Sequence, residues 1–328
     1  MSTTLEYYTA ADLLHRTAPR EGEVRLGEVL PTVDPQLWES EQPLPYKFVI
    51  VGVEEDFGVR ANFGRGGAQH SFAAFLSFLC NMQDNRFFPT ESVAVLGAVV
   101  ATAREEDDQI VQLRKATAQN DFLVSSIVER IVRGGAIPIV IGGGHNNAYG
   151  CLRGTSSALG HPVSCLNIDA HTDLRALEGR HSGNGFRYAM EHGYLERYFM
   201  LGLQENYTPE YIWQFIEDHE LVDYLSFDDY LSGEESLEEA YVRIAELLGS
   251  HFALEIDVDV IAQFPSSAQS ISGFSYDQVR EMVYALDVVP HYLHLCEGRI
   301  GSDQEAPIVG RGLALLVADF IKSHIFSE

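Results

Sequence analysis

Short apolar runs alternate with amphipathic stretches along most of the chain after residue 45. Most of these runs are continuously apolar, which is typical of strands buried on both faces of a parallel sheet. The predicted strands are Phe48–Val53, Val93–Ala98, Ile137–Ile141, Val163–Ile168, Tyr198–Leu203, Tyr224–Phe227, Phe252–Val260 and Tyr292–Cys296. The pattern therefore predicts a mostly parallel sheet of eight strands.

The stretches between the runs carry helical signals. Apolar residues repeat at threes and fours from Phe122 to Val132, and Gly134-Gly135 follows where the helix should end. A second stripe extends from Leu237 to Leu248. Ser275, with Gln278 three residues later, resembles a capping box. Alternating strands and helices predict a doubly wound α/β fold with helices on both faces of the sheet.

The chain shows no repeat, low-complexity tract or linker, which favours one catalytic domain over residues 46–328. Residues 1–45 are polar and punctuated by proline. We expect them to form an irregular or partly helical N-terminal arm, either between subunits or as a lid. In an open parallel sheet, ligands bind beyond the carboxyl ends of the strands. That edge is where the chemistry is expected.

Composition narrows the classes of partner. Among 328 residues, 22 are basic and 48 acidic, so the formal net charge is −26. Repulsion disfavours nucleic acid and anionic membranes as partners, although acidity also serves solubility. The four cysteines are scattered without a C-x-x-C pair, as in a reduced cytoplasmic protein. We expect neither a signal peptide nor an apolar run near the ~18–20 residues that span a bilayer.

Three clusters of acidic residues and histidine follow three of the predicted strands. Their six side chains are His145, Asp169, His171, Asp173, Asp257 and Asp259. Such carboxylates would repel one another in a low-dielectric site unless cations lay between them. Two divalent ions would neutralise them and activate a water held between the ions. The mixed Asp and His set favours Mn²⁺, with Ni²⁺, Fe²⁺ or Co²⁺ as alternatives and Zn²⁺ less favoured.

Each cluster also has an interpretation that involves no metal. Aspartate is common in helix caps and turns at strand ends. Gly142-Gly143-Gly144 also has the look of a phosphate loop, but the G-x-G-x-x-G and GK[ST] contexts are missing. Three clusters after three strands favour the two-metal interpretation over separate caps.

The clusters resemble the motifs of the ureohydrolase superfamily, which contains arginase, agmatinase and formimidoylglutamase. The matching segments are Gly143-Gly144-His145, Asp169-Ala170-His171-Thr172-Asp173 and Asp257-Val258-Asp259, in the family's order. The resemblance covers residues ~46–320 and implies an arginase-like fold with two Mn²⁺. It implies that one ion is held by His145, Asp169, Asp173 and Asp257, and the other by Asp169, His171, Asp257 and Asp259. It further implies that Glu297 pairs with the guanidinium or formimidoyl group of the substrate.

Within the superfamily, the chain looks most like formimidoylglutamase. The features are Gly-Gly-Gly-His, Asp173-Leu174-Arg175, the segment Ser182–Arg187, and the early segments Gly58–Asn62 and Gly64–Gly67. Formimidoylglutamate has two carboxylates, which suit guanidinium forks. The predicted substrate-binding residues are Arg175, Arg180, Ser182, Asn184 and Arg187. The alternative for the three arginines is a local salt-bridge network.

Two departures from the family weaken the case for arginase activity itself. Arginases carry a proton-shuttling histidine just after the Ser-Gly-Asn element, where this chain has Gly185-Phe186. The nearest histidine, His181, lies before that element. Asn146 also stands where relatives often have Ser or Glu.

The prediction is therefore a cytoplasmic, binuclear manganese hydrolase that acts on the C–N bond of linear amidines. We expect it to convert N-formimidoyl-L-glutamate to L-glutamate and formamide in histidine degradation, with Asp173 and Glu297 as catalytic residues. The alternatives are a guanidino acid, agmatine or arginine as the substrate, an amide deacetylase with one zinc ion, or a metal-binding protein without activity. By analogy with relatives, a homotrimer or homohexamer is also expected.

Overall fold

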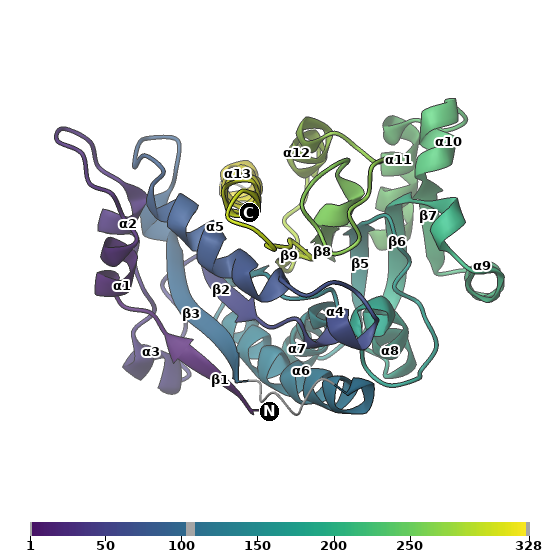
Figure 1. Cartoon of the computed structure of the whole chain (residues 1–328), viewed down its shortest axis with the longest axis horizontal. Helices are drawn as coiled ribbons and strands as arrows, with labels where there is room; N and C mark the ends of the chain where they lie inside the picture. Colours follow the sequence, from purple (N-terminus) through teal and green to yellow (C-terminus); the bar gives the residue numbers. More distant parts are fainter. Residues whose placement is uncertain (1, 103–108, 326–328) are drawn as a thin grey trace.

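The computed structural model describes residues 2–102 and 109–325, and in this part of the chain nine strands form one sheet (Figure 1). The order across the sheet is β1-β3-β2-β4-β9-β8-β5-β6-β7. The strands are β1 (Ser2–Tyr7), β2 (Phe48–Glu54), β3 (Val93–Thr102), β4 (Ile137–Ile141), β5 (Val163–Ile168), β6 (Leu195–Leu203), β7 (Val222–Ser226), β8 (Phe252–Asp257) and β9 (Leu293–Cys296). Every neighbouring pair is parallel except β1 and β3.

Helices cover both faces of the sheet, as expected for a doubly wound fold (Figure 1). One apolar core packs under α5, α11, α12 and α13, and the other under α6, α7, α8 and α9. The helices are α1 (Ala10–His15), α2 (Leu26–Val29), α3 (Pro35–Glu39), α4 (Phe57–Ala61), α5 (Ser71–Cys80), α6 (Ile110–Arg133), α7 (Asn147–Leu159), α8 (Gly185–Glu191), α9 (Glu210–Glu217), α10 (Phe227–Ser232), α11 (Leu237–Leu248), α12 (Tyr276–Tyr284) and α13 (Glu305–His324). None of the helices in residues 2–102 and 109–325 is long and apolar enough to cross a membrane.

The predicted elements are present, with small shifts at their ends. Strands β4 and β5 have the predicted bounds, α6 ends at a Gly134 cap, and the Ser275–Gln278 capping box begins α12. The prediction for Phe252–Val260 was too long. The strand ends at Asp257, whose side chain accepts from the Asp259 N–H and starts a 3₁₀ turn over Val258–Val260.

The predicted count of eight strands was wrong, because β1 adds a ninth at the edge of the sheet. This strand pairs antiparallel with β3, from Ser2 opposite Thr102 to Tyr7 opposite Gly97. Its sequence is mostly polar, since an edge strand is not covered on both faces. It therefore lacks the continuous apolar run that revealed the central strands. The division into an arm (1–45) and a catalytic domain (46–328) stays a prediction.

Candidate metal and substrate site

Four neighbouring strands at the centre of the sheet deliver the predicted site residues. Strands β4, β9, β8 and β5 lie side by side, and His145, Glu297, Asp257 and Asp169 come at or just after their carboxyl ends. The register pairs Ile168 with Ile256, which puts Asp169 level with Asp257. Parallel pairing thus gathers residues from distant parts of the chain, as the sequence predicted.

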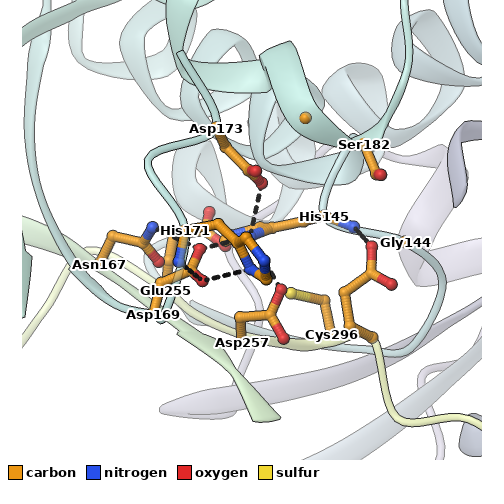
Figure 2. Close-up of polar contacts among 12 residues, drawn as sticks. Gly144, His145, Asn167, Asp169, His171, Asp173, Ser182, Glu255, Asp257 and Cys296 are labelled. Atoms are coloured by element: carbon orange, nitrogen blue, oxygen red, sulfur yellow. Dashed lines mark hydrogen bonds and ion pairs between the residues drawn. The ribbon is translucent and has the colours of Figure 1, made fainter. Parts of the chain in front are cut away.

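The six predicted metal ligands form one cluster, here called the floor, in which all but the partly exposed His171 are buried: His145, Asp169, His171, Asp173, Asp257 and Asp259. Three carboxylate oxygens surround Nδ1 of His145, at 3.1 Å for Asp169, 3.0 Å for Asp173 and 3.3 Å for Asp257 (Figure 2). These contacts converge on one point, as ligands of a single cation do.

A second convergence lies beside the first. Nδ1 of His171 is 3.0 Å from Oδ2 of Asp259 and 3.6 Å from Oδ1 of Asp169. His145, Asp169 and Asp257 form one group whose ligand atoms are close enough to share an ion, and Asp169, His171 and Asp259 form another. Asp169 belongs to both groups, which is the arrangement of a bridging carboxylate.

The electrostatics of the floor fit bound cations. Burial, followed by the charges of Asp259 and Asp169, raises the pKa of Asp257 well above its ordinary value. The ring nitrogens of His145 and Oδ1 of Asp259 are buried without hydrogen-bond partners. Buried polar atoms are normally paired, so unpartnered nitrogen and oxygen atoms among four carboxylates fit a place for divalent ions.

The loop that carries His145 is fixed by a buried glutamate, Glu55, directly after β2. Oε1 of Glu55 accepts hydrogen bonds from the Gly144 N–H at 3.3 Å, from Asn146 Nδ2 at 3.1 Å and from Asn147 Nδ2 at 2.8 Å. Gly143 has a φ of 70° in this turn, where a Cβ would meet the carboxylate. Asn146, a departure from the family pattern, is thus part of the loop's support.

Behind His145 lies a second buried carboxylate, Glu255. It accepts a hydrogen bond from the Tyr292 hydroxyl at 2.6 Å, and its other oxygen lies 2.5 Å from Nδ1 of His294 and 3.5 Å from Nε2 of His145. Burial acts to raise the pKa of Glu255, but His294 and His145 outweigh it and lower the pKa to about 2. Glu255 therefore stays ionised against the outer face of the His145 ring, where such groups orient a ligand.

Glu297 lies at the boundary between the floor and a pocket. Its Oε1 accepts the His145 N–H at 2.8 Å, while Oε2 is buried without a partner. Burial raises the pKa of Glu297 to about 7. Its φ is 62°, in the left-handed region that non-glycine residues rarely adopt. Strained backbone of this kind concentrates at functional sites.

A pocket of about 500 Å³ opens above the floor. It reaches His171, Asp173, Asp257, Asp259 and Glu297 at its base. The lining also includes Tyr207, Pro209 and Ile212, together with a polar group that we call the rim: Asn62, Arg175, Ser182 and Gly183. The pocket has the size and the few convergent polar groups that are typical of small-molecule sites.

The five predicted substrate-binding residues divide into two sets. Arg175 and Ser182 lie on the pocket wall, whereas Arg180, Asn184 and Arg187 have other surroundings. The guanidinium of Arg180 is buried against Asp121 of α6, with Nε 2.8 Å from Oδ2. It also donates to Oδ1 of Asn184 at 2.6 Å and to the Asn146 carbonyl at 2.9 Å. Arg187 lies over the ring of Phe215.

His181 is buried inside the loop rather than facing the pocket. Its Nδ1 accepts the Gly183 N–H at 3.2 Å, and its Nε2 lies 3.1 Å from Oε1 of Glu178. Burial, helped by the charge of Arg114, lowers the pKa of His181 to about 4. A neutral ring with both nitrogens engaged supports the loop and leaves neither nitrogen for proton transfer in the pocket.

The fold and the floor define the class: an α/β protein with two adjoining groups of candidate metal ligands beside a pocket for a small molecule. The chain belongs to the arginase family, whose sequence profile matches residues 46–294. The predicted superfamily and arginase-like fold are thus confirmed.

Known relatives agree with this assignment. The formimidoylglutamase of Geobacillus kaustophilus (strain HTA426) is 30% identical over 227 residues, which cover 68% of this chain and 66% of that protein, just under two thirds of its length. The structure of Trypanosoma cruzi formiminoglutamase with Mn²⁺ is similar with a TM-score of 0.71 and 21% identity, over 91% of this chain and 98% of that one. Proclavaminate amidino hydrolase from Streptomyces clavuligerus gives a TM-score of 0.69 with 20% identity, over 94% and 99% of the two chains. At these identities the two structures show a shared fold.

Three residues of the site were not predicted from the sequence: Glu55, Glu255 and Asn62. Glu255 carried a usable signal, because a carboxylate inside the apolar run Phe252–Ile256 must find partners when it is buried. Glu55 gave no such signal, and Asn62 entered the sequence analysis only as the last residue of the Gly58–Asn62 segment, without a role. Their roles depend on contacts with loops about ninety or more residues away in the chain.

Proposed function

We propose that the protein hydrolyses N-formimidoyl-L-glutamate to L-glutamate and formamide with two Mn²⁺. The observation that carries this proposal is the polarity of the pocket, which has carboxylates at its base and a guanidinium on its rim. The substrate has the opposite polarity, with a cationic amidine at one end and two carboxylates at the other. Electrostatic complementarity of this kind selects among related ligands.

The proposed ligands of the two ions are the six residues of the floor. His145, Asp169, Asp173 and Asp257 would hold one ion, and Asp169, His171, Asp257 and Asp259 the other. When bound, the ions would neutralise the carboxylates and lower the pKa of water for attack on the amidine carbon.

The protein side chains have separate parts in the proposed reaction. Glu297 binds the amidinium through its unpartnered Oε2, which aims the amidine carbon at the floor. Water adds to that carbon, and the bond from the carbon to the glutamate nitrogen breaks. Asp173, which lines the pocket, carries the proton from water to the leaving amine. Arg175 and Ser182 hold the carboxylate end, while Arg180, Asn184 and Arg187 would act indirectly by supporting the loop.

A panel of substrates tests the proposal. Protein saturated with Mn²⁺ is given N-formimidoyl-L-glutamate, 4-guanidinobutyrate, agmatine and arginine, and formamide and urea are measured separately. Formamide from the first compound, with little urea from the others, is the expected result. Strong urea release without formamide would overturn the proposed substrate. No turnover of any compound by protein that holds two Mn²⁺ would favour the metal-binding protein without activity.

A guanidino acid is the second candidate substrate. The same floor and the same Glu297 suit a planar guanidinium as well as an amidine, because both cations have forked N–H donors. The rim favours an acidic compound over agmatine, which carries no carboxylate for Arg175. Urea from 4-guanidinobutyrate at a higher kcat/KM than formamide from formimidoylglutamate would establish this alternative.

A further inference from the structure

Asn62 lies between the two rim residues that face the pocket, Arg175 and Ser182. It follows the end of α4, and its side-chain amide bonds in two directions. Oδ1 accepts a hydrogen bond from NH1 of Arg175 at 3.2 Å, and Nδ2 donates to Oγ of Ser182 at 3.3 Å. One amide thus connects a cation and a hydroxyl that belong to the same loop, Arg175–Ser182, from a separate part of the chain.

Gly183 provides the space in which this arrangement fits. A Cβ at this position would lie 2.8 Å from Nδ2 of Asn62 and 3.0 Å from Cδ of Arg175. The Gly183 carbonyl also accepts the Arg175 N–H at 3.0 Å, which closes the loop beneath the two side chains. The amide of Asn62 and the stem of Arg175 therefore pack directly over a residue without a side chain.

The hydrogen bonds of Asn62 leave donors of Arg175 and Ser182 available to bind an anion. Because the Ser182 oxygen accepts from Asn62, its own O–H can donate elsewhere. In the described part of the chain, Arg175 makes no ion pair and has Asn62 as its one side-chain hydrogen-bond partner. A guanidinium has five donors, so most of them stay available. The free donors of Arg175 and Ser182 both lie on the pocket wall.

We propose that Asn62 is a positioning residue that holds Arg175 and Ser182 in place to receive a substrate carboxylate, and so makes the enzyme selective for acidic amidines or guanidines. The inference rests on the proposed function and extends it to a residue outside the three metal motifs. A side chain that is ordered before binding loses less entropy when the ligand arrives, which improves affinity without touching the chemistry. Asn62 itself is not expected to contact the reacting carbon.

Two substitutions at Asn62 separate positioning from mere structural support. Asn62→Leu keeps the branched shape of the side chain, with some added volume, and removes both hydrogen bonds, so KM for N-formimidoyl-L-glutamate should rise about tenfold with kcat within about twofold. Asn62→Asp should raise KM further, because the new carboxylate competes with the substrate for Arg175. If Asn62 only shapes the loop, the near-isosteric Asp should be better tolerated than Leu, and kcat should fall together with Tm. That pattern would overturn the inference.

Gly183→Ala tests the same inference without removing a polar group. The added methyl should displace Asn62 and Arg175 and raise KM several-fold, with Mn²⁺ stoichiometry unchanged. Asn85→Ala, at an exposed asparagine outside the pocket lining, is the control and should leave both constants unchanged. A KM for Gly183→Ala equal to that of the native protein would argue against close packing on the rim.

The test also distinguishes failure of this inference from failure of the proposed function. If the native protein cleaves 4-guanidinobutyrate instead, the proposed substrate fails, and the Asn62 variants are scored on the KM of that acid against agmatine. If the native protein cleaves neither acid, its affinity for L-glutamate, measured by calorimetry, replaces KM as the quantity that is compared. Unchanged L-glutamate affinity in Asn62→Leu, or no binding of any of these acids to the native protein, would reject the role of Asn62.

Discussion

The floor and the rim are built on different principles, although residues of both line one pocket. The floor comes from the ends of adjacent parallel strands, where the register alone brings Asp169 level with Asp257. The rim is held by side-chain contacts between loops, such as Asn62 with Arg175. Five of the six floor residues are buried and His171 is partly exposed, whereas Arg175 is exposed. We infer that the floor fixes the reaction and that the rim fixes which substrate undergoes it.

The largest effect is expected from the floor, in Asp257→Asn. This change removes a carboxylate shared by both proposed ions, so activity should fall by about 10³-fold or more and bound Mn²⁺ should drop below two per chain. Without metal, the variant should be at least as stable as the native protein, because burial and its neighbours already disfavour the charge on Asp257. Elemental analysis and calorimetry, with and without Mn²⁺, measure both effects. Two ions retained in the variant would contradict the proposed ligand set.

Arg180→Met tests the support beneath the rim. It leaves the buried Asp121 carboxylate without its partner, which typically costs about 3–5 kcal/mol of stability. The folded fraction should keep its preference for acidic substrates, since Arg180 does not line the pocket. Denaturant unfolding and substrate KM give the two readouts.

A double variant provides the control for that experiment. Adding Asp121→Asn to Arg180→Met removes the uncompensated charge and should restore part of the lost stability. If Arg180→Met keeps the native stability but loses the preference for acidic substrates, the conclusion would instead be that Arg180 contacts the substrate directly.

The same contrast explains how much the sequence could predict. The clustering of the floor residues was predictable because each lies at or after the end of an apolar strand, and parallel strands of one sheet end at one edge. For the rim, the sequence showed three arginines close together but not their directions. Arg180 and Arg175 differ in role because Asp121 on α6 faces only the first, a contact across 59 residues that no local pattern encodes. Strand β1 was missed for a different reason, because its sequence is mostly polar and lacks the continuous apolar run of the central strands.

Glu297→Gln examines the boundary between the two regions. Glutamine keeps an oxygen for the His145 N–H but loses the charge that faces the pocket. Removing a charge-assisted hydrogen bond to the substrate cation should lower kcat/KM by about 10²-fold while both Mn²⁺ ions stay bound. Loss of metal together with activity would place Glu297 in the floor instead. Steady-state kinetics combined with metal analysis distinguishes the two outcomes.

The smallest effect is expected from acid, through His181 beneath the rim. Its pKa is lowered to about 4 in the folded protein, against about 6.5 when unfolded. Between these values the unfolded chain binds more protons, so this contribution to stability is present above pH 6.5 and is lost as the pH falls toward 4. Burial and the charge of Arg114 disfavour the proton in the folded loop, and protonated Nδ1 could no longer accept the Gly183 N–H. Between pH 6.5 and 5, His181→Gln should therefore lose about 1–2 kcal/mol less free energy of unfolding than the native protein. The variant should show this as a smaller fall in Tm over the same range. The measurement uses protein saturated with Mn²⁺, so that the protonation of the floor stays constant while His181 titrates. An unchanged slope in the variant would mean that the loss of stability at acid pH begins in the floor and not beneath the rim.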